Sequence, residues 1–133
     1  MKTVLIADDE ANLRLLVAAT LAAGDCEIIE AADGNEAWKI IVEHRPQVAI
    51  LDIQMPGRTG LEITRAIKAD PSLAQIRIVI LTSKARPADV TGGMEAGADF
   101  YLTKPFLPIE LLTAVEQALD KIGRASVGKE CRL

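Results

Sequence analysis

Four short apolar runs, spread along the whole chain, each lead directly into residues with polar or charged side chains. The runs are Val4–Ala7, Val48–Leu51, Ile78–Leu81 and Phe100–Thr103, and the residues that follow are Asp8-Asp9, Asp52, Thr82 and Lys104. Runs this apolar and this rich in β-branched residues are typical of strands buried on both faces of a parallel sheet. Ligands bind such sheets at the carboxyl ends of the strands. The pattern therefore predicts three carboxylates, a hydroxyl and an ammonium group at one edge of a sheet.

Helical patterns separate the apolar runs, so strands and helices alternate along the chain. A shorter run, Cys26–Glu30, is half polar and is predicted to lie near the sheet edge. A weak helix is expected over about Pro87–Ala96. The last helix is expected to bury one apolar stripe, formed by Ile109, Leu112, Val115, Leu119 and Ile122. The fold class is thus α/β, a doubly wound (βα)₅ arrangement, and right-handed crossovers place helices on both faces of the sheet.

Length and charge limit the functions that need considering. The 133 residues fit one domain, which is predicted over residues 1–122. Residues 123–133 are predicted to be a flexible tail or the start of a linker. The net charge of −4, without a basic stripe, argues against nucleic-acid binding by this chain. No apolar stretch approaches the roughly 20 residues of a membrane span. Two cysteines make no disulfide framework, and a cytoplasmic location is expected.

The predicted edge of the sheet carries a chemistry of its own. Carboxylates at Asp8, Asp9 and Asp52 would repel one another, and a hard cation such as Mg²⁺ removes that repulsion. An aspartate can also act as a nucleophile and form an aspartyl phosphate. Phosphoryl transfer needs a metal, a cation and a hydroxyl or N–H donor around the transferred group. Asp52, Lys104 and Thr82, together with a metal, supply that set.

Five motifs in order and at matching spacing complete the pattern. They are Asp8-Asp9, Asp52-Ile53-Gln54-Met55-Pro56 through Gly60, Thr82-Ser83, Glu95 through Tyr101, and Lys104-Pro105-Phe106. Any one of them alone is a weak signal. Together, over residues 2–122, they resemble the receiver domain of bacterial two-component response regulators, the family of the chemotaxis protein CheY. The resemblance implies a five-stranded parallel sheet in the order 2-1-3-4-5.

The resemblance also implies a role for each matching residue. Asp52 is the phosphoacceptor, and Mg²⁺ is bound by Asp9, Asp52 and the backbone carbonyl of Gln54, with Asp8 acting through water. Lys104 contacts the phosphoryl group, and the Lys104–Pro105 peptide bond is usually cis in this fold. Thr82 turns its hydroxyl toward a phosphoryl oxygen, and Tyr101 moves inward behind it. The protein is then a signalling switch that assists its own phosphorylation and dephosphorylation, not an enzyme acting on a separate substrate.

The partners implied are a histidine kinase or a histidine phosphotransfer protein as donor. A downstream protein target is implied on the surface of the fourth helix, fifth strand and fifth helix. The chain is expected to be a monomer or a weak, phosphorylation-dependent dimer, with no membrane partner.

Other interpretations stay open. A phosphatase of the haloacid-dehalogenase type needs Asp-x-Asp after the first strand, whereas the two aspartates here are adjacent. Flavodoxin-like cofactor binding needs a Ser-, Thr- and Gly-rich loop where this chain is acidic. The chain could also be the receiver fragment of a larger regulator with a DNA-binding or enzymatic output domain. Taken singly, Thr82 reads as a turn cap and Tyr101 as a residue at the edge of the core.

Overall fold

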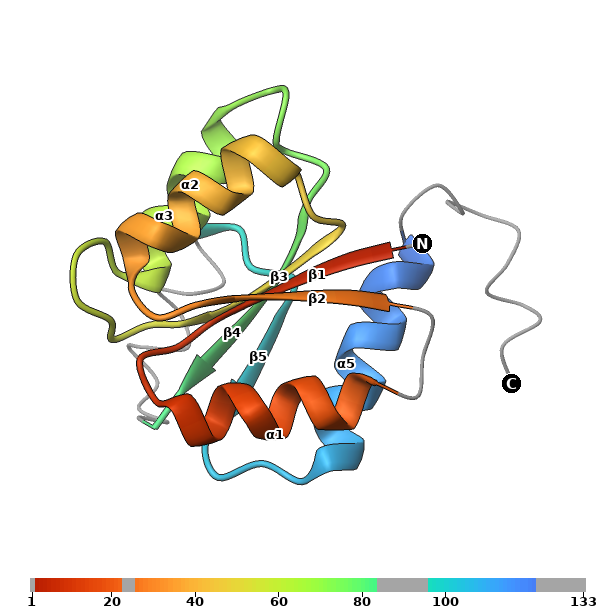
Figure 1. Ribbon diagram of the computed structural model, residues 1–133. Helices are drawn as coiled ribbons and strands as arrows, with labels where there is room; N and C mark the ends of the chain where they lie inside the picture. Colours follow the sequence, from red (N-terminus) through yellow and green to blue (C-terminus); the bar gives the residue numbers. More distant parts are fainter. Residues whose placement is uncertain (1, 23–25, 84–95, 122–133) are drawn as a thin grey trace.

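The computed structural model describes residues 2–22, 26–83 and 96–121. A five-stranded parallel sheet in the order β2-β1-β3-β4-β5 forms its centre, as predicted (Figure 1). The strands are β1 Lys2–Ala7, β2 Cys26–Ala31, β3 Val48–Asp52, β4 Arg77–Thr82 and β5 Phe100–Thr103. The helices described are α1 Ala11–Leu21, α2 Gly34–His44, α3 Gly60–Ala69 and α5 Pro108–Lys121. The half-polar strand β2 lies at the sheet edge, where its exposed residues meet solvent.

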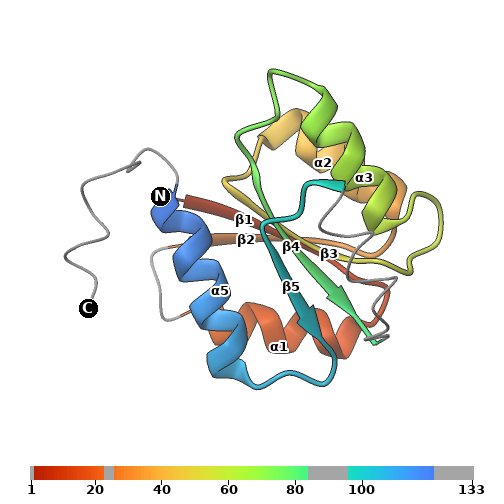
Figure 2. The ribbon, with the colours of Figure 1, turned by 180° about the vertical axis from the view of Figure 1, so that it is seen from behind.

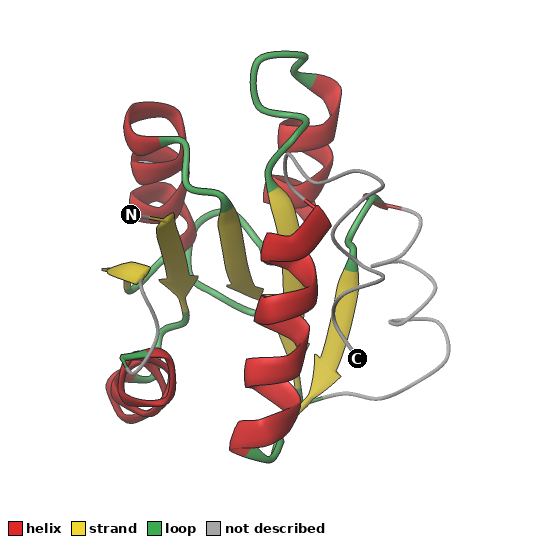
Figure 3. Ribbon diagram, turned by 90° about the vertical axis from the view of Figure 1, so that its right-hand side faces the viewer, coloured by secondary structure: helices red, strands yellow, loops and turns green. Residues whose placement is uncertain are grey.

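Helices cover both faces of the sheet, α2 and α3 on one and α1 and α5 on the other (Figures 1 and 2). Alternate residues of the central strands point to opposite faces. Leu51 and Ile80 therefore pack in the cluster beneath α2 and α3, and Ile50 and Leu81 pack in the cluster beneath α1 and α5. The side view shows the sheet between these helix layers (Figure 3). All five residues of β3 are buried, so the carboxylate of Asp52 ends a fully enclosed strand.

Two of the helices begin with side-chain caps close to the carboxyl edge of the sheet. The Asp33 side chain accepts a hydrogen bond from the Glu36 N–H at 2.8 Å and caps α2. Thr59 and Glu62 form a capping box at the start of α3. These caps define where the loops after β2 and β3 end, and the loop after β3 follows Asp52 directly.

The stripe predicted for the last helix was partly wrong. Ile109 is 61% exposed, and the buried face of α5 consists of Leu111, Ala114, Val115 and Ala118. The prediction chose the largest apolar residues. The buried positions follow the helical spacing i, i+3, i+4, i+7 from Leu111, and Ile109 falls outside that face. Leu112 and Leu119 are partly buried beside it.

Some predictions fall outside the described residues. The weak helix expected over about Pro87–Ala96 lies there except for Ala96, and so does the tail over residues 123–133. The surface of the fourth helix, fifth strand and fifth helix is therefore described only through β5 and α5. Among the described residues, no helix has the length and apolar character needed to cross a membrane.

Candidate functional site

Three carboxylates gather at the carboxyl edge of the sheet, as the strand ends predicted. One ligand oxygen from each of Asp8, Asp9 and Asp52 can be chosen so that all three lie within 4.8 Å of one another. Asp8 and Asp52 are buried, with 0% and 6% of their surface exposed, whereas Asp9 is exposed. Asp8 and Asp9 directly follow β1, and Asp52 ends its neighbour β3. Adjacent strand ends thus bring together residues that lie more than 40 positions apart.

Lys104 reaches this acidic cluster from the loop after β5. Its Nζ lies 2.8 Å from Asp8 Oδ2, 3.3 Å from Asp52 Oδ2 and 3.5 Å from Glu10 Oε1. All three contacts also have hydrogen-bond geometry. One ammonium group therefore partly neutralises two buried carboxylates and the exposed Glu10.

The electrostatics of the site disfavour a charged Asp52. Burial, followed by the nearby charge of Asp8, raises the pKa of Asp52 from 3.8 to about 6, although Lys104 and the Gln54 N–H oppose the rise. For Lys104, burial lowers the pKa, but the hydrogen bonds and charges of Asp8 and Asp52 outweigh burial, and the net pKa is raised. The cluster therefore has an excess of negative charge that a single lysine does not balance, and a cation would be attracted to it.

The backbone around the site is held by specific contacts. The Gln54 N–H donates to Asp52 Oδ1 at 3.3 Å, and the Lys104 N–H donates to the Thr82 carbonyl at 2.7 Å. At Gly60 a Cβ atom would collide with the main-chain oxygen of Asp52, so the chain can turn back past the aspartate only because glycine stands there. The Lys104–Pro105 peptide bond is cis, as the resemblance implied.

Thr82 and Tyr101 lie on neighbouring strands and on the same face of the sheet. Thr82 ends β4 and is 2% exposed. Tyr101 pairs in register with Ile80, two residues before Thr82. Tyr101 is partly buried and packs against the core cluster beneath α2 and α3, to which Ile80 also belongs. Thr82 and Tyr101 therefore lie close in the register of neighbouring strands and face the same helix layer.

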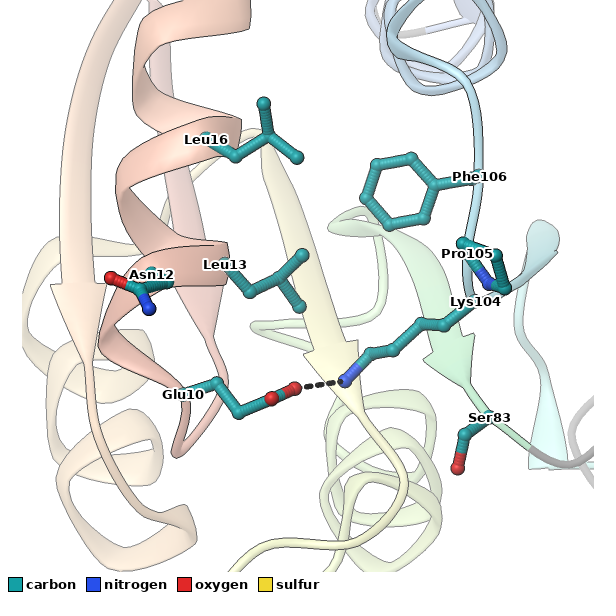
Figure 4. A pocket seen from close by; sticks show the side chains of 8 residues that line it. All are labelled: Glu10, Asn12, Leu13, Leu16, Ser83, Lys104, Pro105 and Phe106. Atoms are coloured by element: carbon teal, nitrogen blue, oxygen red, sulfur yellow. Dashed lines mark hydrogen bonds and ion pairs between the residues drawn. The ribbon is translucent and has the colours of Figure 1, made fainter.

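An open pocket of about 500 Å³ adjoins the acidic cluster between the start of α1 and the loop after β5 (Figure 4). Its walls are mostly apolar, and Lys104 and Glu10 form an ion pair on one side of it. The same Lys104 ammonium contacts Asp8 and Asp52, so this side adjoins the acidic cluster. The pocket is lined by Glu10, Asn12, Leu13, Leu16, Ser83, Lys104, Pro105 and Phe106. The sequence did not predict this pocket. Leu16, which lines it, is 43% exposed.

Comparison with known proteins agrees with this geometry. The family model for the response regulator receiver domain matches residues 4–116. The chain belongs to this family. Its relatives include the phosphate regulon transcriptional regulatory protein PhoB of Pseudomonas aeruginosa, 38% identical over 92% of this chain and 53% of PhoB. The DNA-binding response regulator MtrA of Mycobacterium tuberculosis is 35% identical over 89% of this chain and 50% of MtrA.

Solved receiver structures share the fold. The chemotaxis response regulator CheY4 of Vibrio cholerae superimposes with a TM-score of 0.83 at 34% identity, covering 90% of this chain and 99% of CheY4. The BeF₃-activated DrrB receiver domain gives a TM-score of 0.82 at 31% identity, covering 90% of this chain and 98% of that domain. This receiver chain spans about half the length of the curated relatives PhoB and MtrA.

Proposed function

We propose that this receiver domain takes a phosphoryl group onto Asp52 from the phosphohistidine of a histidine kinase or a histidine phosphotransfer protein. The observation that carries the proposal is the environment of the Asp52 carboxylate. It ends a buried central strand, lies 3.3 Å from the Lys104 ammonium and stands beside two further carboxylates. A buried carboxylate with a raised pKa, placed among groups that can bind a metal and a phosphate, is typical of a functional site.

The three clustered carboxylates fit a Mg²⁺ ion. Mg²⁺ takes oxygen ligands and is usually held by one or two carboxylates plus waters and phosphate oxygens. Asp9 and Asp52 would bind it directly with the backbone carbonyl of Gln54, and Asp8 would act through water. When bound, the ion offsets the negative charge of the carboxylates and of the incoming phosphate. The excess of carboxylates over Lys104 supports this assignment.

During transfer, a carboxylate oxygen of Asp52 forms a bond to phosphorus, and the bond from phosphorus to the donor's histidine nitrogen breaks. The electron pair of that bond stays on the imidazole. Lys104 then offers its ammonium to the phosphoryl oxygens, since its Nζ already lies beside both Asp52 and Asp8. Positioning and charge neutralisation of this kind account for most of the catalysis in phosphoryl transfer. The domain would in this way assist its own phosphorylation and dephosphorylation.

Phosphorylation of Asp52 would change the protein surface through movements of the Thr82 and Tyr101 side chains. A phosphoryl group adds about −1.5 to −2 charges and several acceptor oxygens. The Thr82 hydroxyl would turn toward one of these oxygens, and the Tyr101 ring would move inward behind it. Their position on one face of neighbouring strands supports this coupling. The readout would be protein binding on the surface of the fourth helix, fifth strand and fifth helix.

The phosphoryl donor is proposed to dock over the pocket beside Lys104. The pocket leads from the acidic cluster to an apolar surface that includes Leu16, and Leu107 and Ile109 are exposed near the start of α5. A protein that brings a histidine to Asp52 must contact the surface next to the three carboxylates. An apolar surface at that place gives such a protein contact area without placing more charge beside the cluster.

The cellular role has two candidate forms. In the first, residues 1–122 are a stand-alone receiver domain in the cytoplasm, residues 123–133 are a tail, and the chain is a monomer or a weak phosphorylation-dependent dimer. In the second, the chain is the receiver part of a larger regulator, with residues 123–133 starting a linker. The second form is consistent with the chain's spanning only about half of PhoB and MtrA, whose names describe transcriptional and DNA-binding regulators, but this observation does not favour it over the first.

The acceptor is tested with acetyl phosphate, a small donor that needs no partner protein. Incubation with acetyl phosphate and Mg²⁺ should add the mass of one phosphoryl group to the intact protein. Asp52→Asn should abolish the addition, because an amide is not a nucleophile of this kind. EDTA should prevent it in the wild type. An Asn variant labelled to the wild-type level would refute the assignment of Asp52.

A further inference from the structure

Arg14, near the start of α1, makes two charge-assisted contacts around the acidic loop. Its Nη1 donates to the main-chain oxygen of Asp8 at 2.7 Å, and its Nε donates to Glu30 Oε1 at 3.1 Å. Glu30 stands on β2, opposite Ile6 of β1 in the parallel register. The guanidinium side chain is mostly buried, with 18% exposed. One planar group thus ties the turn after β1 to the neighbouring edge strand.

These contacts complete the hydrogen bonding of Asp8. Its N–H donates to the Ala31 oxygen at 3.1 Å, and its Oδ1 accepts from the Glu10 N–H at 2.9 Å. Its Oδ2 accepts from Lys104 at 2.8 Å. Arg14 supplies the remaining contact, to the main-chain oxygen. One of the four hydrogen bonds of Asp8 thus comes from a residue of α1 that touches no carboxylate of the cluster.

Arg14 and Lys104 present their charges to the site in different ways. Lys104 contacts carboxylate oxygens that a metal ion would also use, so its ammonium group competes with the metal ion for them. Arg14 binds a backbone oxygen, which leaves the carboxylates of Asp8 and Asp9 available, and Glu30 balances its charge. The guanidinium can therefore hold the turn without lowering the affinity of the cluster for a cation as much as an unpaired arginine would.

We propose that Arg14 is a positioning residue for the metal site, and that its two-point contact with Asp8 and Glu30 keeps the acidic turn in the geometry that binds Mg²⁺. The inference rests on the proposed function, because it takes Mg²⁺ as the ion of the acidic cluster. Groups that orient metal ligands typically change metal affinity about 10- to 100-fold when they are removed.

The sign of the effect separates positioning from simple electrostatics. Removing a positive charge close to a cation site should by itself strengthen Mg²⁺ binding. If Arg14 positions the turn, Arg14→Met should instead weaken binding, with the Kd for Mg²⁺ rising about tenfold. Arg14→Lys keeps the charge but cannot make both contacts with one ammonium group, so its Kd should rise severalfold as well.

The experiment titrates Mg²⁺ alone into the full chain by calorimetry and measures urea unfolding of each variant without the metal. Arg77→Met is the matched control, because Arg77 also pairs with a carboxylate, Asp99, at 3.4 Å and begins β4, at the amino-terminal end of the strands and away from the acidic cluster. Its Kd should stay within about twofold of the wild type, whatever stability it loses. This control separates a local effect at the acidic turn from a general loss of stability.

Weaker Mg²⁺ binding in both Arg14 variants, with the control unchanged, supports the proposal. A Kd for either Arg14 variant that equals the wild-type value or lies below it overturns it. If Arg14→Met does not fold, Arg14→Lys alone decides by the same criterion. A wild-type chain that shows no Mg²⁺ binding would instead refute the metal part of the proposed function, so the two failures are distinguishable.

Discussion

Replacing Asp52 by Asn should stabilise the metal-free protein, although it removes the proposed phosphoacceptor. The buried Asp52 carboxylate lies beside Asp8, and its pKa is raised from 3.8 to about 6. A raised pKa means that folding disfavours the charged form of this group. At neutral pH the wild type must fold with that charge in place, and the Asn variant does not.

The size of the effect follows from the shift in pKa. A shift from 3.8 to about 6 corresponds to about 3 kcal/mol at neutral pH. Asn keeps one acceptor oxygen but turns an amide group toward either the Gln54 N–H or the Lys104 ammonium, which costs about 1 kcal/mol. The expected net gain in unfolding free energy is about 2 kcal/mol. For a chain of this size that is roughly 8 °C in Tm.

The pH dependence gives the prediction its sign. Between the unfolded pKa of 3.8 and the folded pKa of about 6, the native state binds more protons at Asp52 than the unfolded state does. The contribution of Asp52 to stability therefore falls as the pH rises through this window. The advantage of Asp52→Asn should be complete above about pH 7, shrink as the pH falls, and vanish at about pH 4.5, where the remaining gain equals the cost of the amide. At lower pH the variant should be slightly less stable than the wild type.

The assay is urea unfolding of both proteins in EDTA across this pH range, repeated with saturating Mg²⁺. Mg²⁺ should stabilise the wild type more than the variant and narrow the gap, because a ligand that binds only the native state stabilises it. Asp70→Asn is the control, since hydrogen bonds from Ser72 lower the pKa of Asp70 and the same substitution there should not stabilise the protein. If Asp52→Asn is no more stable than the wild type at neutral pH in EDTA, the electrostatic account of the site is wrong.

Three further predictions concern neighbours of the acidic cluster. Lys104→Met should destabilise the metal-free protein by about 3 kcal/mol, because it leaves buried carboxylates unpaired, and Mg²⁺ should restore more stability to it than to the wild type in urea unfolding. Leu16→Glu should slow phosphoryl transfer from a histidine kinase to Asp52 but not from acetyl phosphate. Leu15→Glu, on the same helix but outside the pocket, should change neither rate. Equal effects of the two substitutions on transfer from the kinase would rule out docking at the pocket. Thr82→Ala should still accept phosphate at Asp52, but its NMR shifts on adding beryllofluoride, a stand-in for the phosphoryl group, should be smaller over β5 and α5. A full wild-type shift pattern would remove Thr82 from the coupling path.

Much of the fold was predictable because burial leaves a strong pattern in a parallel sheet. Runs such as Val48–Leu51 have no polar positions, so they identify central strands, and the mixed run at Cys26 identifies an edge strand. The carboxyl ends of the strands then determine which residues meet, and Asp52 and Lys104 were expected together on that ground. The structure places them there, with the Lys104 ammonium 3.3 Å from Asp52 Oδ2.

Other features depend on distances that a sequence does not carry. The buried face of α5 was misjudged at Ile109, because the largest apolar residues of a helix need not be the ones that face the sheet. The pocket beside Leu16 depends on the separation of α1 from the loop after β5. The Arg14 contact was missed because its partner is a main-chain oxygen, and every residue type has one. Contacts of that kind leave no mark in the pattern of residue types.

The most direct test of the central claim is to locate the acyl phosphate in the chain. The protein is phosphorylated with acetyl phosphate and Mg²⁺ and treated with borohydride, which reduces an aspartyl phosphate to homoserine, and the modified residue is then mapped by peptide mass spectrometry. The account predicts homoserine at position 52 only, with none formed when EDTA replaces Mg²⁺. Homoserine at Asp8 or Asp9, or an unmodified Asp52 in protein that carries the phosphate, would contradict it.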